Sequence, residues 1–196
     1  MEKEKTIKIF LGSSYLLIVL VFLWFFFTYF SIEDISSYEI IKSNRDSLNA
    51  LKDNNIILTS FLFFLGTIIW VLLLGFAAPI ILIGGFIFGK WLGIFLVTLG
   101  LSVGATLLYI FTNFFLKEII KKKFSSKFNN LNNKFKKNEF IFFLIYRFVG
   151  GIPFFISNIL PALFNIMIKN FFICSLIGMT PQLFVGVCLG DGLNKI

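Results

Sequence analysis

The sequence predicts an all-α polytopic membrane protein in which two re-entrant helical hairpins face each other. Three observations predict this fold class: the composition, the length of the uncharged segments, and the glycines and prolines that interrupt two of them. Of the 196 residues, 58% are hydrophobic and only 14% are charged, and the mean hydropathy is +0.91. Soluble domains are about 45–50% apolar and about 25% charged, so the bilayer is the expected solvent.

The first uncharged segment, residues 9–30, is long enough to cross about 30 Å of hydrocarbon as a helix. The residues that follow it, 31–34, do not form the small-residue cleavage site of a signal peptide, so we expect an uncleaved anchor. Residues 31–55 are polar, with apolar residues at roughly helical spacing, which indicates an amphipathic surface helix. The predicted domains are therefore this anchor and surface loop, 1–55, and a membrane domain, 56–196.

The second uncharged segment, residues 54–89, is too long for one straight span of about 20 residues. We expect a spanning helix over about residues 56–75, followed by a broken element over about residues 76–90 that enters the membrane without crossing it. The breakers inside this segment are Gly75, Pro79, Gly84 and Gly85. A further span, residues 92–116, carries glycines spaced for close helix contact, at Gly93, Gly100 and Gly104.

Residues 117–138 are strongly basic. Their apolar residues recur every three or four positions and form one stripe on a helix, flanked by lysines. This pattern is typical of an interfacial helix on an anionic leaflet. A nucleic-acid-binding arm is disfavoured because of the phenylalanine stripe and the membrane context, so nucleic acid is not an expected partner.

A second broken element is predicted over residues 139–168, and a final span over residues 170–190. Positively charged loops face the cytoplasm, which places the Lys-bearing N-terminus and the basic segment 117–138 there, in a multi-pass protein of the inner (plasma) membrane. With the net-acidic loop 31–55 outside, the two broken elements dip into the membrane from opposite faces. Transporters use inverted arrangements of this kind, with sites near the midplane.

Arg147 is the one charged side chain deep in an apolar stretch. A guanidinium in hydrocarbon is unfavourable by about 2.5–3.5 kcal/mol on insertion scales, so it needs an anion or a route to the interface. One interpretation is general headgroup contact near the cytoplasmic interface, since Glu139 is only eight residues away. The other is a bidentate grip on an anionic substrate such as a phosphate.

The neighbours of Arg147 favour substrate binding. Gly150 and Gly151 can break the helix, Pro153 suits the first turn of a new half-helix whose free N–H groups attract anions, and Asn158 adds a neutral donor and acceptor. The opposing element supplies glycines that allow tight turns and packing. The candidate substrate-binding residues are therefore Arg147, Gly150, Gly151, Pro153, Asn158, Pro79, Gly84, Gly85 and Gly89.

Catalysis has no support in the sequence. Histidine is absent, no carboxylate lies inside a predicted span, and no cysteine cluster has metal-ligand spacing. We therefore expect neither an enzyme nor a cofactor, and no acidic carrier for proton-driven transport. Cys174 and Cys188 lie in one apolar segment, where they act as small buried hydrophobes too far apart for a disulfide.

The two broken elements resemble those of the VTT-domain, or DedA-like, superfamily, also called SNARE-associated Golgi proteins. The run from Gly84 to Gly89 with Gly93 resembles its first glycine-rich hairpin, and residues 147–158 resemble its second. The run Gly178-Met179-Thr180-Pro181 with Gly186 and Gly190 resembles its closing helix. The resemblance covers roughly residues 38–192. Its upstream run, from Tyr38 to Pro79, also resembles the branch that contains yeast Golgi vesicle membrane proteins and their bacterial relatives.

This resemblance implies opposed re-entrant hairpins and movement of phospholipids or polyprenyl-phosphate carriers between leaflets. It gives Arg147 an important role, with Pro153 and Asn158 at matching positions. Gly150 stands where a proline is common, and the acidic residue of the proton-coupled bacterial branch is missing between Gly75 and Gly89. These departures favour passive scrambling or an undefined role over proton-coupled flipping.

The leading hypothesis from the sequence is a lipid flippase or scramblase, with membrane lipids as partners at Arg147 and at the basic segment. Two alternatives remain open: a secondary transporter for a small anion, and a non-transporting scaffold that acts through its Lys-rich helix. The sequence also leaves open a homo-oligomer.

Overall fold

The computed structural model describes residues 12–15, 17–22, 24, 25, 28, 55–73, 75–115 and 138–194. These residues form helices and connecting turns without any strand, as the sequence predicts. The predicted basic helix, 117–138, and nearly all of the predicted surface loop, 31–55, lie outside the described residues. The described residues between 12 and 28 are helical, and the Tyr15 ring lies 4.1 Å from the Phe111 ring.

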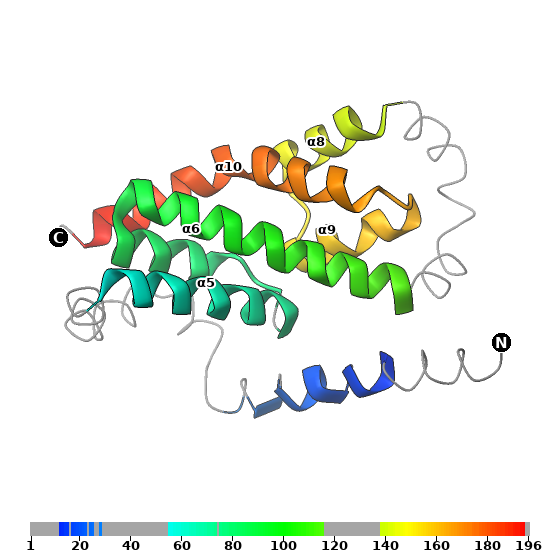
Figure 1. The fold of residues 1–196 in the computed structure, drawn as a ribbon, viewed down its shortest axis with the longest axis horizontal. Coiled ribbons are helices and arrows are strands. Elements are labelled where there is room, and N and C mark those ends of the chain that lie inside the picture. The colour runs from blue at the N-terminus through cyan, green and yellow to red at the C-terminus, as the bar shows by residue number, and fades with distance from the viewer. Residues whose placement is uncertain are drawn as a thin grey trace.

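Three described helices are long and apolar enough to cross a membrane: α5 (Ile56–Leu73), α6 (Ala78–Phe115) and α10 (Ile168–Leu193). Shorter helical elements lie beside them: α8 (Glu139–Val149), α9 (Phe154–Ile159) and the 3-10 helix η1 (Leu160–Leu163). In Figure 1, α6 and α10 run side by side through the molecule, with α5 below α6 and α8 above α10. The short helix α9 is drawn between the start of α10 and the C-terminal end of α6, on which it packs.

The helix α5 and the first part of α6 form a helical hairpin, which contains the first predicted broken element. The Asn55 side chain caps α5 by accepting from the amides of Ile57 and Leu58, both at 3.1 Å. The chain turns after α5 at Gly75, whose φ is +67°, and enters α6. Pro79 lies in the first turn of α6, where its missing N–H leaves no helical bond unmade.

The helix α6 is broken at Gly89, whose φ of 70° and ψ of −178° fall in a region open essentially to glycine alone. The break divides α6 into a short arm, residues 78–88, and a long arm, residues 90–115. The short arm folds back along the long arm, so that a Cβ on Gly93 would lie 2.7 Å from the Gly84 carbonyl oxygen.

Gly84 and Gly85, two of the predicted breakers, do not break the chain. Both are helical in the short arm, and the break falls instead at Gly89. Their missing side chains serve packing, because a Cβ on Gly85 would overlap the backbone carbonyl of Val187 in α10. The packing role predicted for the long-arm glycines is confirmed: a Cβ on Gly100 would lie 2.9 Å from Thr67 of α5.

The second broken element contains α8 and α9. Helix α8 ends at Gly150 and Gly151, which have φ values of 65° and 79°, and α9 begins after Pro153. Helix α8 packs on α10, whereas α9 packs on α6. At the base of this element, Glu139 Oε1 accepts hydrogen bonds from the amide of Met167 (2.9 Å) and the side chain of Asn170 (2.7 Å), at the start of α10.

The helix α10 joins the two broken elements. Near its middle, Gly178 lies against α8, where a Cβ would be 2.7 Å from the Cβ of Arg147. Further along, Gly186 and Gly190 lie against the short arm of α6 at Ile81 and Leu82. Pro181 lies between these two contact regions, inside the helix.

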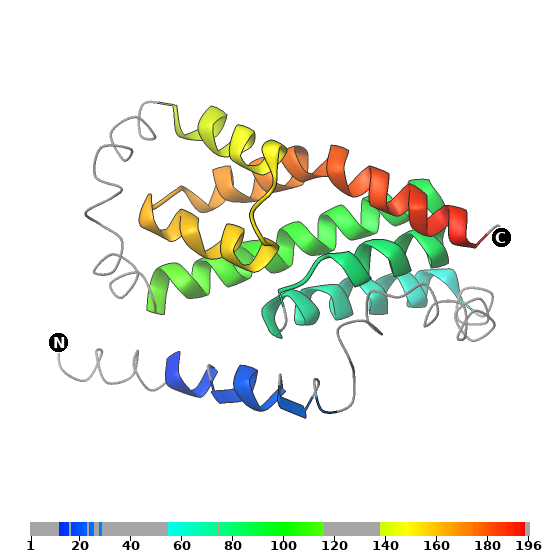
Figure 2. The ribbon, with the colours of Figure 1, turned by 180° about the vertical axis from the view of Figure 1, so that it is seen from behind.

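The turns of the two broken elements meet near the middle of the molecule. Gly75, after α5, packs on Phe155 of α9, where a Cβ would lie 2.7 Å from the ring. The turn at Gly89 lies at the end of the molecule that holds the C-terminal end of α10, near Asp191. The starts of α8 and α10 lie at the opposite end, as the view from behind also shows (Figure 2).

Candidate functional site

Arg147 lies in the last turn of α8 and is only 4% exposed. Its guanidinium crosses the space between α8 and α9. One terminal nitrogen donates to Ser157 Oγ at 3.0 Å, and the other donates to Asn158 Oδ1 at 2.8 Å. Asn158 is fully buried, and Ser157 Oγ also donates to the carbonyl of Phe154 at 2.8 Å. These bonds fix the guanidinium between the two helices.

Aromatic rings enclose the same guanidinium. Its central carbon lies 4.7 Å from the centroid of the Phe171 ring and 5.1 Å from that of Phe143. Phe171 is stacked between Phe143 and Tyr109, with centroid distances of 5.0 and 4.3 Å. The negative faces of such rings stabilise a cation without neutralising its charge.

Arg147 has no carboxylate partner among the described residues. The charged groups that the structure describes besides Arg147 are Lys90, Glu139, Lys169 and Asp191, and all four lie at or near helix ends or the turn at Gly89. The acceptors that contact Arg147 are neutral. Its Nε has no partner, nor does the side-chain nitrogen of Asn158. The site therefore keeps a net positive charge and unused donors in the middle of an apolar bundle.

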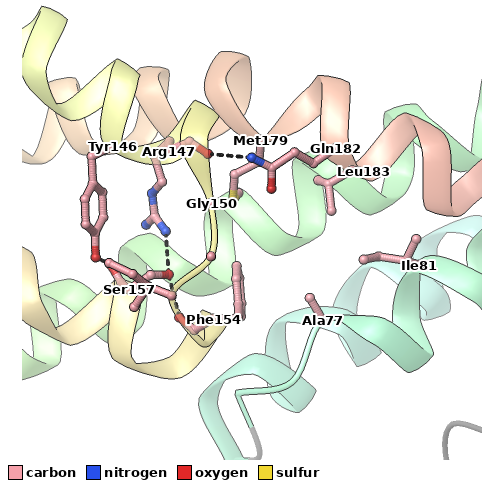
Figure 3. A pocket seen from close by; sticks show the side chains of 12 residues that line it. Ala77, Ile81, Tyr146, Arg147, Gly150, Phe154, Ser157, Met179, Gln182 and Leu183 are labelled. Atoms are coloured by element: carbon pink, nitrogen blue, oxygen red, sulfur yellow. Dashed lines mark hydrogen bonds between the residues drawn. The ribbon is translucent and has the colours of Figure 1, made fainter.

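A cavity of about 200 Å³ lies beside Arg147. Figure 3 shows its walls. Ala77 and Ile81 come from the first broken element, and Met179, Gln182 and Leu183 come from α10. The second broken element contributes Tyr146, Arg147, Gly150, Gly151, Ile152, Phe154 and Ser157. The α10 residues are near the middle of that helix, since Met179 is the twelfth and Leu183 the sixteenth of its 26 residues. The cavity is thus formed where all three parts meet.

Gln182 holds the end of α8 from across the cavity. Its side-chain nitrogen donates to the carbonyl of Arg147 at 3.3 Å and to that of Phe148. These carbonyls lack helical partners because the chain breaks at Gly150. A side chain on Gly150 would meet the Gln182 amide within 3 Å, so the glycine allows this contact.

The structure separates the sequence-predicted site residues into two groups. Arg147, Gly150 and Gly151 line the cavity, Asn158 binds Arg147, and Pro153 precedes the first residue of α9. The four predicted site residues of the first broken element do not line the cavity. Pro79, Gly84, Gly85 and Gly89 lie along the short arm of α6, where Gly85 faces α10 and Gly89 faces Asp191.

Sequence reasoning missed Ser157, Tyr146 and Gln182. Ser157 precedes Asn158 and, like it, accepts a hydrogen bond from the Arg147 guanidinium. The Tyr146 hydroxyl donates to the Ser157 carbonyl at 3.3 Å. Gln182 carried the clearest available signal, since an amide in the middle of an apolar span needs polar surroundings. Among the described residues no group of three or more His, Cys, Asp or Glu side chains could hold a metal ion.

These features define an integral membrane protein with several apolar helices and a cationic site at the middle of the bundle. The chain belongs to the VTT domain family, whose pattern matches residues 77–192, as the resemblance in the sequence predicts. It is 27% identical over 120 residues to an uncharacterised protein, YqeD, of Bacillus subtilis (strain 168). The match covers 60% of this chain and spans 58% of YqeD. No solved structure matches the chain significantly.

Proposed function

We propose that this protein moves lipids between the two leaflets of a membrane, with Arg147 binding the headgroup phosphate. The observation that carries the proposal is the buried guanidinium, held by neutral groups at the wall of a cavity. A lone positive charge in hydrocarbon is unfavourable, and a phosphate oxygen is a strong acceptor for its free N–H groups. The family membership supports a membrane role of this kind.

The lengths of the helices support a re-entrant disposition of the two hairpins in the membrane. The short arm of α6 and the helix α8 each have 11 residues, about 16 Å at 1.5 Å per residue, or half of the hydrocarbon layer. The long arm of α6 and α10 have 26 residues each, about 39 Å, enough to cross it. The two broken elements would be re-entrant from opposite faces, with the cavity near the midplane.

Lipid access to the cavity is supported by exposed apolar side chains in the same segments as its lining residues. Val149 and Phe148, at the end of α8, are 72% and 58% exposed, and Ile152 and Phe155 are also exposed. Such side chains are suited to contact acyl chains, while the headgroup reaches Arg147. The described residues hold no carboxylate near the cavity, which favours passive scrambling over proton-coupled flipping.

The protein would lie in the inner (plasma) membrane with its N-terminus and residues 117–138 in the cytoplasm, where the lysines would contact anionic headgroups. This basic segment would brace the cytoplasmic leaflet.

The test is a reconstituted-vesicle assay that follows a fluorescent phospholipid between leaflets. Arg147→Ala should reduce the rate by about tenfold or more, because it removes a charge-assisted hydrogen bond to the phosphate. Lys90→Ala is the matched control, since Lys90 is a cation at the distant turn after Gly89 and should leave the rate unchanged. Wild-type vesicles that move no lipid, or an active Arg147→Ala variant, would overturn the proposal.

The size of the cavity favours a second candidate function, transport of a small anion. A volume of about 200 Å³ is smaller than the ~300–1,000 Å³ of typical ligand pockets and suits inorganic phosphate or a headgroup alone. Vesicles with the protein in their membrane would then take up inorganic phosphate from the medium, while fluorescent phospholipids stay in the leaflet in which they were placed. Lipid movement without phosphate uptake would reject this candidate.

A further inference from the structure

We infer that Gln182 is a specificity-determining residue, which selects substrates that carry an N–H or O–H donor next to their phosphate. This inference rests on the proposed function and refines it, by assigning a second recognition group to the cavity beside Arg147. Two features support it: the orientation of the Gln182 amide and the place of Gln182 in the long apolar helix α10.

The two partners of the Gln182 side chain determine which way its amide points. Both partners, the backbone oxygens of Arg147 and Phe148, are acceptors. An amide contacts two acceptors favourably only through its NH₂ group, so the side-chain oxygen must be directed elsewhere. In Figure 3 that oxygen points into the space between Gly150, Met179 and Leu183. It lies beside Gly150, on the cavity wall.

The oxygen of Gln182 has no hydrogen-bond donor among the described residues. Gln182 is nevertheless exposed, although it lies in the middle of a helix that is long and apolar enough to span the membrane. A carbonyl oxygen that faces hydrocarbon without a donor is unfavourable. The oxygen therefore needs water or a substrate donor, and the cavity is where either could reach it.

The cavity thus offers two different groups to one ligand. Arg147 supplies a positive charge that no described carboxylate neutralises, and Gln182 supplies a neutral acceptor. A phosphate ester with an ammonium or hydroxyl group a few bonds away would satisfy both. A trimethylated amine of the same length has no N–H and would leave the Gln182 oxygen unpaired, which a polar site discriminates against strongly.

The experiment compares phosphatidylethanolamine and phosphatidylcholine with the same acyl chains, whose headgroups differ in that three methyl groups replace the N–H donors. The full-length wild type in vesicles should move the ethanolamine lipid about tenfold faster than the choline lipid, the usual effect of one hydrogen bond to a charged group. Gln182→Met keeps the size and removes the acceptor, so the ratio of the two rates should fall to about one. A general packing defect would lower both rates and leave their ratio unchanged.

A second variant separates acceptor loss from damage to the end of α8. Gln182→Lys retains a donor for the carbonyls of Arg147 and Phe148 but has no acceptor, so the ratio should again fall to about one. Equal rates for the two lipids in the wild type, or a ratio that persists in both variants, would overturn the inference while lipid transport itself stands.

Soluble headgroups distinguish failure of this inference from failure of the proposed function. Purified wild-type protein in detergent should be stabilised against heat more by phosphoethanolamine than by phosphocholine, and Gln182→Met should remove the difference. If this preference is seen but no lipid moves in vesicles, the selectivity of the site holds and lipid transport is rejected. If neither headgroup stabilises the protein and no lipid moves, both proposals fail.

Discussion

At the scale of single residues, the main feature is how Arg147 remains charged inside the bundle. Burial of a cation without a partner is unfavourable by several kcal/mol, in the range of about 2.5–3.5 kcal/mol on insertion scales. Two hydrogen bonds to Ser157 and Asn158 and two flanking rings offset part of this penalty. No described carboxylate neutralises the charge, so under the proposed function it is available to a substrate anion.

Replacing Asn158 by aspartate tests this availability. Asn158→Asp would place a carboxylate about where an oxygen already lies 2.8 Å from Arg147, and the resulting buried ion pair would compete with any substrate anion. We expect a melting temperature equal to or above that of the wild type, with lipid movement reduced by about tenfold or more.

Asn158→Leu is the counterpart of this variant. It removes the acceptor and leaves the guanidinium underpaired, so the free energy of unfolding should drop by about 1–3 kcal/mol. Thermal unfolding in detergent and lipid transport in vesicles measure the two effects. Full transport by Asn158→Asp would show that the charge of Arg147 is not used for anion binding.

The ring of Phe171 provides a second test at this scale. Fluorinated phenylalanines at position 171 keep the shape of the ring but weaken its negative face. The free energy of unfolding should fall with each added fluorine, by a total of about 0.5–2 kcal/mol, because the cation–π contact with Arg147 weakens.

The control for Phe171 is the same fluorination series in an Arg147→Met background, where the dependence on fluorine should vanish. Denaturant unfolding in micelles gives the required free energies. An equal loss in both backgrounds would assign the effect to stacking with Tyr109 and Phe143 instead.

The sequence predicted only part of the site, for physical reasons. Arg147 and the break after it stand out because a charge, two glycines and a proline interrupt an apolar run. The rings of Phe143 and Phe171 could not be singled out, since the chain has 29 phenylalanines and only tertiary packing brings these two to the guanidinium. That Pro79 and Gly85 do not line the cavity likewise follows from how the short arm of α6 is turned.

At the scale of helices, close backbone approach holds the short arm of α6 against α10. Gly85 and Gly190 allow this approach, and side chains at either position would overlap backbone atoms of the other helix. Helix association in lipid relies on such packing because hydrocarbon offers no hydrophobic driving force between apolar helices.

A matched pair of glycine variants tests this packing. Gly85→Ala should lower the free energy of unfolding by about 1–3 kcal/mol through overpacking, because its Cβ would overlap the Val187 carbonyl. Gly66→Ala on α5 is the control, since nothing lies within 4 Å of a Cβ there, and helix propensity should make it neutral or stabilising by up to about 1 kcal/mol. Thermal unfolding in detergent compares the two, and equal stabilities would contradict the packing interpretation.

Helix positions were easier to predict than the turns between them. Uncharged runs of about 20 residues predicted α5, the long arm of α6 and α10, because their lengths match the hydrocarbon layer. The place of the first break was predicted less well. Gly84, Gly85 and Gly89 are alike in sequence, and whether a glycine turns the chain or admits a neighbouring helix depends on what packs against it.

At the scale of the whole molecule, different charged residues mark the two ends of the helical bundle. Lys90 and Asp191 lie at the end that holds the turn at Gly89, whereas Glu139 and Lys169 lie at the other. Because the long arm of α6 and α10 are each long enough to cross the bilayer, these two ends should lie on opposite sides of the membrane.

Cysteine labelling tests this arrangement in a background without Cys174 and Cys188. Lys90→Cys should react with a membrane-impermeant maleimide added outside the cell, and Lys127→Cys, in the basic segment predicted to be cytoplasmic, should react only after permeabilisation. Labelling of both from the same side would reject the predicted topology. Labelling from the reversed sides would retain the fold but invert its orientation.

Pro181 gives α10 a point of weakness between its two sets of neighbours. Proline has no N–H, so one rung of the α10 backbone ladder is missing between Gly178, which touches α8, and Gly186, which touches the short arm of α6. The two halves of this helix can therefore flex against each other more easily than the halves of an unbroken one. Since Gln182 follows Pro181 directly, any such flexing would shift the Gln182 side chain relative to Arg147 across the cavity.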